Sequence, residues 1–301
     1  MRSRLLILCP GQGAQHAQMF ELARGSARAA ALLDSFTLPS ASDPALMFSN
    51  RAAQQLIVAG ALAMWEALRG DAPAPALVAG YSVGELAAYG VAGALGGAEL
   101  LELAALRAAA MDDCRRAHPG QALAAISGLS LPRAAGLMAD DLFYIAIETA
   151  DDSCIAGGPA AGLAALEHKV VAAGARLTRL PVELASHTPY LAAAVAPFAA
   201  ALHGADFQPF TAPVLSGIAA LRVDGKALAV DQLSRQLAEP ILWRGCMDAG
   251  AEAGITVALE LGPGAALSKM LQARHPQIAC RSVADFRSLA GVRRWLEQHC
   301  G

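Results

Sequence analysis

A serine stands between a short apolar segment and a helical segment near residue 80. Residues 76–80 are apolar and follow a proline-rich linker at 71–75, which predicts a short buried strand. Residues 80–84 read Gly-Tyr-Ser-Val-Gly, and a helical pattern begins near Val83. This G-x-S-x-G spacing is typical of a strand–turn–helix unit that projects a serine hydroxyl from the top of a sheet. We therefore expect Ser82 to be a candidate nucleophile, with an ordinary glycine-rich turn as the alternative.

A second buried strand is predicted at residues 5–9, and it ends in a Pro-Gly-Gln-Gly turn at 10–13. The turn lacks the third glycine of a dinucleotide-binding fingerprint and the lysine of a phosphate loop, so both functions are excluded. A turn at the carboxyl end of a strand can still present backbone amides to a pocket above the sheet. Together with the Val83 amide it could hold an oxyanion; otherwise it is only a turn.

The pattern changes between residues 121 and 184. There the expected order is strand, helix, strand, strand, helix, strand, which is the order of a ferredoxin-like module. At 301 residues, 55% of them hydrophobic, the chain is long enough for a large α/β domain with a small inserted one. We predict a large α/β hydrolase-like domain at 1–120 and 185–301, interrupted by the insert at 121–184.

Charge and composition exclude several functions. The net charge of −3 and the absence of a basic run interleaved with aromatics argue against a nucleic-acid partner. The apolar run at 5–8 is too short for a signal peptide, and the longer apolar stretches are interrupted before they could span a bilayer. A cytoplasmic protein without membrane contact is expected. The six cysteines are scattered, with no Cys-x-x-Cys pair, so we expect free thiols and no metal.

A serine hydroxyl needs a general base, and seven histidines compete for that role. His187 lies where the predicted insert returns to the main domain, a junction that favours clefts. A purely structural role for this histidine is equally open. His16, close to the 11–13 turn, is the second candidate base, and the other five histidines suit surface positions.

Arg107 is the only charged residue in the otherwise apolar helical segment 103–111. A buried arginine demands a carboxylate, and a substrate carboxylate could pair with it through two parallel hydrogen bonds. The alternatives are an internal ion pair with Glu85, Glu102 or Asp112, or extension of the side chain to the surface.

Taken in chain order, these segments resemble the malonyl-CoA:acyl-carrier-protein transacylase family over nearly the whole chain. The matching segments are 10–15 (Pro-Gly-Gln-Gly-Ala-Gln), 80–85 (Gly-Tyr-Ser-Val-Gly-Glu), Arg107 with Met111, Ser186-His187, 236–243 (Gln-Leu-Ala-Glu-Pro-Ile-Leu-Trp) and 260–264 (Glu-Leu-Gly-Pro-Gly). The resemblance implies a hydrolase-like large domain with a ferredoxin-like insertion, in agreement with the pattern above.

The resemblance also implies catalytic roles. Ser82 would attack a thioester, and His187 would take and return the serine proton. The amides of Gln12 and Val83 would hold the oxyanion. The backbone carbonyl of Gln236 would orient the imidazole, so the site would be a Ser–His dyad without an acidic partner.

The substrate and partners follow from the same resemblance. Arg107 would bind the free carboxylate of a malonyl group, which would pass from malonyl-CoA to the thiol of an acyl carrier protein. No permanently bound cofactor is implied; coenzyme A enters as a thioester, and the carrier offers a phosphopantetheine-type thiol. We expect a monomer or weak dimer.

Two departures from the family pattern lie beside the candidate dyad. Tyr81 replaces the usual histidine and Ser186 the usual phenylalanine. The 184–187 segment (Leu-Ala-Ser-His) resembles the pattern of methylmalonyl-selective acyltransferases. The same segments also resemble the epsilon subunit of malonate decarboxylase, which transfers malonyl to its own carrier subunit. Malonate-decarboxylase and fatty-acid-synthesis types are therefore both considered. A serine thioesterase or esterase and a non-catalytic carrier-binding subunit are the alternative functions.

Overall fold

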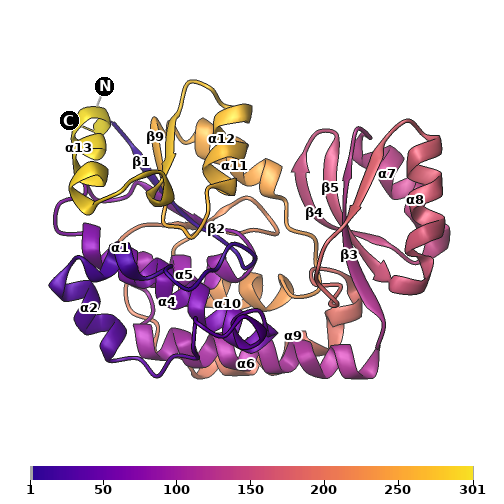
Figure 1. The fold of residues 1–301 in the computed structure, drawn as a ribbon, viewed down its shortest axis with the longest axis horizontal. Helices are drawn as coiled ribbons and strands as arrows, with labels where there is room; N and C mark the ends of the chain where they lie inside the picture. Colours follow the sequence, from indigo (N-terminus) through magenta and orange to yellow (C-terminus); the bar gives the residue numbers. More distant parts are fainter. Residues whose placement is uncertain (1–2, 301) are drawn as a thin grey trace.

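A computed structural model describes residues 3–300 and contains two sheets (Figure 1). The larger sheet has six strands in the order β10-β9-β1-β2-β7-β8. Its strands pair in parallel except for the antiparallel pair β7–β8. The strand bounds are β1 Leu5–Cys9, β2 Leu77–Gly80, β7 Val214–Leu215, β8 Arg222–Val223, β9 Val257–Glu260 and β10 Ala279–Ser282.

Strand β1 lies inside this sheet because every one of its five residues is apolar and buried. Its alternate side chains enter two different cores: Leu5 and Ile7 pack on one side, and Leu6 and Leu8 on the other. A strand buried on both faces is what a parallel sheet between two helical layers requires. Since β1 pairs in parallel with both β2 and β9, the turns that follow these three strands meet at one edge of the sheet.

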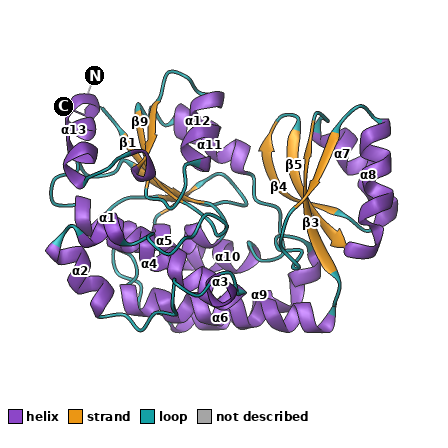
Figure 2. Cartoon of the chain, viewed as in Figure 1, coloured by secondary structure: helices purple, strands orange, loops and turns teal. Residues whose placement is uncertain are grey.

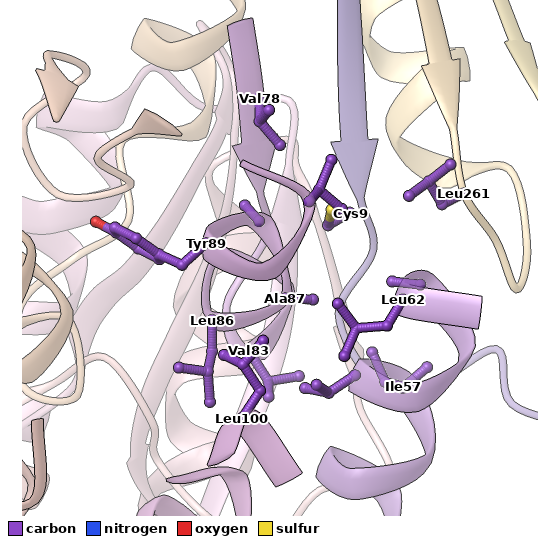
Figure 3. Close-up of a cluster of buried hydrophobic side chains, with 14 of the residues drawn as sticks. Cys9, Ile57, Leu62, Val78, Val83, Leu86, Ala87, Tyr89, Leu100 and Leu261 are labelled. Carbon is purple, nitrogen blue, oxygen red and sulfur yellow. The ribbon is translucent and has the colours of Figure 1, made fainter. Parts of the chain in front are cut away.

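Helices cover both faces of the large sheet. One core includes side chains of α4, α5 and α6, and Figure 3 shows α5 packed between β2 and α4. The other core includes side chains of α11 and α12. The helices outside the small sheet are α1 Glu21–Arg24, α2 Ala27–Asp34, α3 Pro44–Met47, α4 Asn50–Leu68, α5 Val83–Val91, α6 Gly97–Ala117, α9 Ala192–Gly204, α10 Lys226–Arg235, α11 Trp243–Glu252, α12 Ala266–Arg274 and α13 Leu289–Cys300, with 3-10 turns at Pro189–Leu191 and Val283–Asp285.

The smaller sheet is antiparallel, with the strand order β4-β5-β3-β6, and helices α7 and α8 lie beside it at the right of Figure 2. The chain order is β3 Gln121–Ser127, α7 Leu131–Met138, β4 Tyr144–Ala150, β5 Ser153–Pro159, α8 Leu163–Ala172 and β6 Arg176–Arg179, with 3-10 turns at Ala139–Asp141 and Ala160–Gly162. This is the expected ferredoxin-like order. The predicted fold class, a parallel-sheet α/β structure with a ferredoxin-like insertion, is confirmed.

The small sheet is joined to the rest of the chain by main-chain hydrogen bonds at β4. Ile241 donates its N–H to the Ala146 carbonyl at 2.9 Å, and Glu148 donates to the Ile241 carbonyl at 2.8 Å. These bonds make a parallel bridge between Ile147 and Ile241. The segment that begins at Gln236 therefore reaches from the end of α10 to the edge of the small sheet.

Three global features bear on the expectations from sequence. All six cysteines are free, and four of them are buried. Within residues 3–300, no helix combines the length and the apolar character needed to cross a membrane. In the same range, no group of three or more His, Cys, Asp or Glu side chains is placed to hold a metal ion.

Candidate active site

Ser82 occupies a sharp turn between β2 and α5, in a backbone conformation that non-glycine residues rarely adopt, with φ 57° and ψ −122°. The turn is possible because Gly84 lies directly against the end of β1. A Cβ atom on Gly84 would fall 2.1 Å from the Cys9 carbonyl oxygen. We call residues 80–84 the serine turn. It lifts the Ser82 side chain above the carboxyl edge of the sheet, at the N-terminus of a helix.

The Ser82 hydroxyl is hydrogen-bonded to His187, with 2.8 Å between Oγ and Nε2. The other ring nitrogen, Nδ1, donates to the backbone carbonyl of Gln236 at 2.6 Å. This bond fixes the tautomer in which Nε2 accepts the serine proton. The loop is itself anchored, because the His187 N–H donates to the Leu237 carbonyl at 2.9 Å. Serine, imidazole and carbonyl thus form one hydrogen-bonded chain.

His187 is 1% exposed, and this burial lowers its pKa to about 3; the positive charge of Arg107 lowers it further, and the bond to Gln236 opposes the shift. The imidazole is therefore neutral at physiological pH. A neutral imidazole is the protonation state that a general base needs.

The backbone amides of Val83 and Gln12, near Ser82, have no acceptor within residues 3–300. Val83 is the first residue of α5, so its N–H points out of the helix end. Gly11 brings the other turn close, because a Cβ on Gly11 would lie 3.7 Å from the Ser82 Cβ. Two free donors beside a hydroxyl suit stabilisation of a developing oxyanion.

Arg107 is 2% exposed and contacts no carboxylate among residues 3–300. The three expected ion-pair alternatives are therefore wrong as direct contacts, and the side chain does not reach the surface. Asp112 instead bonds to the Asn50 amide, and Glu102 is exposed. Glu85 acts on Arg107 only across an intervening glutamine.

The guanidinium is held by neutral groups instead. Arg107 donates to Gln54 Oε1 at 2.8 Å, to Met111 Sδ at 3.2 Å and to Gln236 Oε1 at 3.1 Å. Burial lowers its pKa to about 10, and the negative charge of Glu85 opposes that shift, so Arg107 is a cation at neutral pH. We call Gln54, Glu85, Arg107, Met111 and Gln236 the arginine cluster. A buried cation held only by neutral dipoles is a strong attractor for a ligand carboxylate.

Gln236 joins the two parts of the site. Its backbone carbonyl holds His187, and its side-chain oxygen holds Arg107. Its side-chain N–H groups donate to the Ser82 carbonyl at 3.2 Å and to Glu85 Oε2 at 2.5 Å. The structure therefore brings together Ser82, His187, Arg107 and Gln236.

Sequence reasoning missed Gln54 as a site residue and saw Glu85 only as an ion-pair partner. Both side chains are 0% exposed. A usable signal was present, since each is a polar residue within an apolar helical segment. An isolated buried polar group needs a partner, and the pattern does not say which one.

The other sequence candidates lie around this centre. The ring of His16 is exposed and has no hydrogen bond to Ser82 among the described residues. Tyr81 packs edge-on against Trp243, with 5.3 Å between ring centroids. Ser186 lies in the loop before His187, where its N–H donates to the Leu184 carbonyl.

Cavities open beside the hydrogen-bonded centre. One of about 660 Å³ is lined by His187 together with Met138 and Phe143 of the small-sheet region. Another of about 560 Å³ is lined by Gln12 with charged side chains of both signs: Arg51, Arg115, Arg179, Asp112 and Glu183. An acyl thioester could thus approach a site that is largely apolar on one side and lined by charged groups on the other.

The chain matches the family model described as the acyl transferase domain over residues 41–293. The malonyl CoA-acyl carrier protein transacylase of Mycobacterium bovis is 31% identical over 305 residues, covering 96% of this chain and 100% of that protein. The acyl-carrier-protein S-malonyltransferase of Burkholderia pseudomallei has a similar structure, with a TM-score of 0.90 and 26% identity over 98% of this chain and 99% of the other. The malonyl-CoA:acyl carrier protein transacylase of Xanthomonas oryzae superposes with a TM-score of 0.89 and 26% identity over the full length of both chains.

Proposed function

The chain belongs to the acyl transferase domain family, and from this membership we propose that it transfers malonyl from malonyl-CoA to an acyl-carrier-protein thiol through an ester on Ser82. One observation carries the proposal. Gln236 is bonded both to the imidazole that faces Ser82 and to the buried cation Arg107. Gln236 therefore holds the nucleophile's base and a carboxylate-binding cation in one site. An acyl group with a free carboxylate needs both, because its carbonyl must lie at Ser82 while its carboxylate is bound.

In the first half-reaction, the Ser82 hydroxyl attacks the thioester carbonyl while His187 Nε2 takes its proton. The oxyanion of the tetrahedral intermediate accepts hydrogen bonds from the amides of Gln12 and Val83. Collapse breaks the carbon–sulfur bond, and the imidazolium returns its proton to the leaving CoA thiolate. The product is a malonyl ester on Ser82.

In the second half-reaction, the carrier thiol gives its proton to His187 and attacks the ester carbonyl. The carbon–oxygen bond to Ser82 breaks, and the serine oxygen recovers the proton from the imidazolium. No proton is gained or lost over the cycle. The thiol belongs to the partner, so the chain itself needs no permanently bound cofactor.

Arg107 gives the reaction its preference for acyl groups with a carboxylate. Its guanidinium has donors beyond those used by Gln54, Met111 and Gln236, and these would bind the malonyl carboxylate. Acetyl offers no partner to this buried cation, so selectivity follows from the cost of leaving it without one.

We further propose that residues 121–184 form an inserted domain and that 1–120 with 185–301 form the larger one. The four strands of the small sheet all lie within 121–179, which supports this division. The loop that carries His187 begins directly after it, so the acyl site would lie at the junction of the two domains. A monomer or weak dimer is part of the same proposal.

The decisive experiment incubates the protein with malonyl-CoA and measures intact mass. A malonyl adduct is expected on the wild type and not on Ser82→Ala, and an adduct on neither would favour a non-catalytic carrier-binding subunit. Release of CoA at the same rate with and without carrier would indicate a thioesterase.

A second experiment identifies the carrier and the acyl group. A fatty-acid-synthesis carrier and a malonate-decarboxylase carrier are compared as acceptors, with malonyl, methylmalonyl and acetyl donors in parallel. Faster transfer to the first carrier supports the fatty-acid-synthesis type, and faster transfer to the second supports the malonate-decarboxylase type.

A further inference from the structure

Glu85 is a buried acid that takes no part in the proton transfers at Ser82 and His187 or in the oxyanion contacts. It lies in the first turn of α5, three residues after Ser82, and is 0% exposed. Its Oε2 accepts from the Gly217 N–H at 2.9 Å and from Gln236 Nε2 at 2.5 Å, whereas its Oε1 has no partner within residues 3–300. A half-satisfied buried carboxyl is costly, so its presence beside a nucleophile calls for an explanation.

Glu85 fixes the orientation of the Gln236 amide. An amide has a donor end and an acceptor end. Because the carboxylate of Glu85 accepts at the nitrogen end, the oxygen end points to the Arg107 guanidinium. The opposite orientation would set oxygen against carboxylate and NH2 against guanidinium, which are two repulsive contacts. Glu85 and Arg107 therefore clamp the side chain of Gln236 from both ends.

The clamped residue is the one whose backbone carbonyl holds His187, at 2.6 Å from Nδ1. The clamp also holds Gln236 Nε2 on the carbonyl of Ser82. Loosening the Gln236 side chain would thus affect both members of the dyad. A small displacement of the base or of the nucleophile lowers the reaction rate strongly.

Glu85 also carries the counter-charge of Arg107. Arg107 on α6 is the charged group that acts on the Glu85 carboxyl; Tyr89 on α5 and Cys246 on α11 also lie within reach of its charge. Burial raises the pKa values of Tyr89 and Cys246 well above their usual range, so both stay neutral. His187, on the loop across Gln236, is neutral as well. The pair Arg107–Glu85 therefore dominates the local charge, and an arriving carboxylate must compete with Glu85 for Arg107.

We propose that Glu85 is a positioning residue: it holds the Gln236 amide between Arg107 and the dyad, and its charge sets how strongly Arg107 attracts an acyl carboxylate. This inference rests on the proposed function and names a determinant of its acyl-group selectivity.

The charge can be switched in an accessible pH range. Burial raises the pKa of Glu85 to about 7, and hydrogen bonds from Gly217 and Gln236 together with the charge of Arg107 oppose that shift. Below pH 7 the carboxyl is protonated and leaves Arg107 uncompensated. Above pH 7 it is ionised and competes with malonyl, so KM for malonyl-CoA rises with pH. Acetyl-CoA carries the same CoA phosphates without the acyl carboxylate, so it reports any pH effect that does not involve Arg107.

The test measures kcat and KM of enzyme acylation for both donors between about pH 5.5 and about pH 8.5 on wild type and Glu85→Gln. In the wild type, the ratio of KM for malonyl-CoA to KM for acetyl-CoA should rise roughly 5-fold or more from the low to the high end of this pH range. Glu85→Gln keeps an acceptor for Gln236 but has no charge. Its kcat should fall less than that of a variant without any acceptor, and the extra pH dependence should disappear. The same pH dependence in Glu85→Gln as in the wild type would overturn the charge role.

Glu85→Leu tests the positioning role. It removes the acceptor, so kcat should fall roughly 10- to 100-fold for both donors, and further than in Glu85→Gln. Folding of each variant is checked by thermal unfolding. If Glu85→Leu does not fold, the comparison with Glu85→Asp replaces it, since a shortened carboxyl weakens the clamp and keeps the charge. A folded Glu85→Leu or Glu85→Asp variant with wild-type kcat would overturn the positioning role.

Glu260→Gln is the matched control, because Glu260 is also a buried acid with a raised pKa and accepts the N–H of Ser268. Among residues 3–300 it makes no hydrogen bond to the dyad or the arginine cluster. It should keep the wild-type pH dependence of KM. A wild type that forms no malonyl adduct would instead contradict the proposed function. Failure of the Glu85 proposal can therefore be distinguished from failure of the proposed malonyl transfer.

Discussion

The serine turn and the arginine cluster lie in one site, joined by Gln236, but they are built differently. The serine turn takes its shape from five consecutive residues pressed against the end of β1. The arginine cluster takes its side chains from α4, α5, α6 and the end of α10, which are far apart in sequence. The first depends on backbone fit and the second on hydrogen bonds between side chains. A change in the turn should therefore disturb folding, whereas a change in the cluster should alter selectivity and pH behaviour.

The largest effect is expected where the turn meets β1. In Gly84→Ala the new Cβ would meet the backbone of Cys9 and Pro10, which cannot move without shifting the strand. We expect a loss of about 3 kcal/mol or more in the free energy of unfolding, or failure to fold, measured by urea denaturation.

Gly136→Ala is the control for that change. Gly136 lies within α7, and nothing lies within 4 Å of an added Cβ. Alanine is the better helix former, so this variant should be neutral or more stable by up to about 1 kcal/mol. Equal destabilisation in both variants would contradict the tight fit of the serine turn.

The next effect concerns the base that the turn faces. His187→Ala should slow acylation of Ser82 by roughly 10²- to 10⁴-fold, because the serine proton loses its positioned acceptor. The rate is followed as the appearance of the acyl adduct by rapid-quench mass spectrometry. His16→Ala should react like the wild type, since its ring is exposed and not bonded to Ser82. The reverse pattern would transfer the role of base to His16.

A smaller and selective effect is expected in the cluster. Arg107→Ala should reduce acylation by malonyl-CoA roughly 10- to 100-fold more than acylation by acetyl-CoA, because only malonyl loses an ionic partner. Arg107→Lys keeps the charge without the planar pair of donors, so its selectivity should be intermediate. Equal losses for both donors would mean that Arg107 supports the fold and does not bind the acyl carboxylate.

The smallest effect is on the pH dependence of stability. His187, which faces the serine turn, and Glu85, in the arginine cluster, should change the free energy of unfolding with pH in opposite directions. The pKa of His187 is lowered from 6.5 to about 3, so its contribution to stability is present above pH 6.5 and is lost as pH falls toward 3. The pKa of Glu85 is raised from 4.5 to about 7, so its contribution is present below pH 4.5 and is lost as pH rises through 7. Between those values the two contributions partly cancel.

Single variants should separate these contributions. In Glu85→Gln, the free energy of unfolding should increase more steeply with pH between about 4.5 and about 6.5 than in the wild type. In His187→Gln it should decrease with pH over the same range. Urea denaturation at several pH values measures both slopes, and identical slopes in all three proteins would contradict the assigned pKa shifts.

Much of the fold was predictable because it depends on local patterns. The strand at 5–9, the turn after residue 80 and the strand–helix order of the inserted segment each follow from runs of apolar residues and their breakers. Two short strands and one amphipathic helix were missed. The prediction assigned no strand to β8 or β10, which are short edge strands with exposed arginines, and no helix to α13 at the end of the chain.

The amino-acid sequence by itself determined that Ser82 stands on a strained strand-to-helix turn, because glycine spacing and neighbouring propensities act over a few residues. It also supplied the histidine and the arginine as candidates. Only the tertiary structure decided their partners, since burial and hydrogen bonding are set by elements that meet after folding. Arg107 was expected to pair with an acid or a substrate; in the folded chain it lies among neutral groups, and one glutamine separates it from Glu85. That arrangement leaves a buried cation free to attract a carboxylate beside the serine turn.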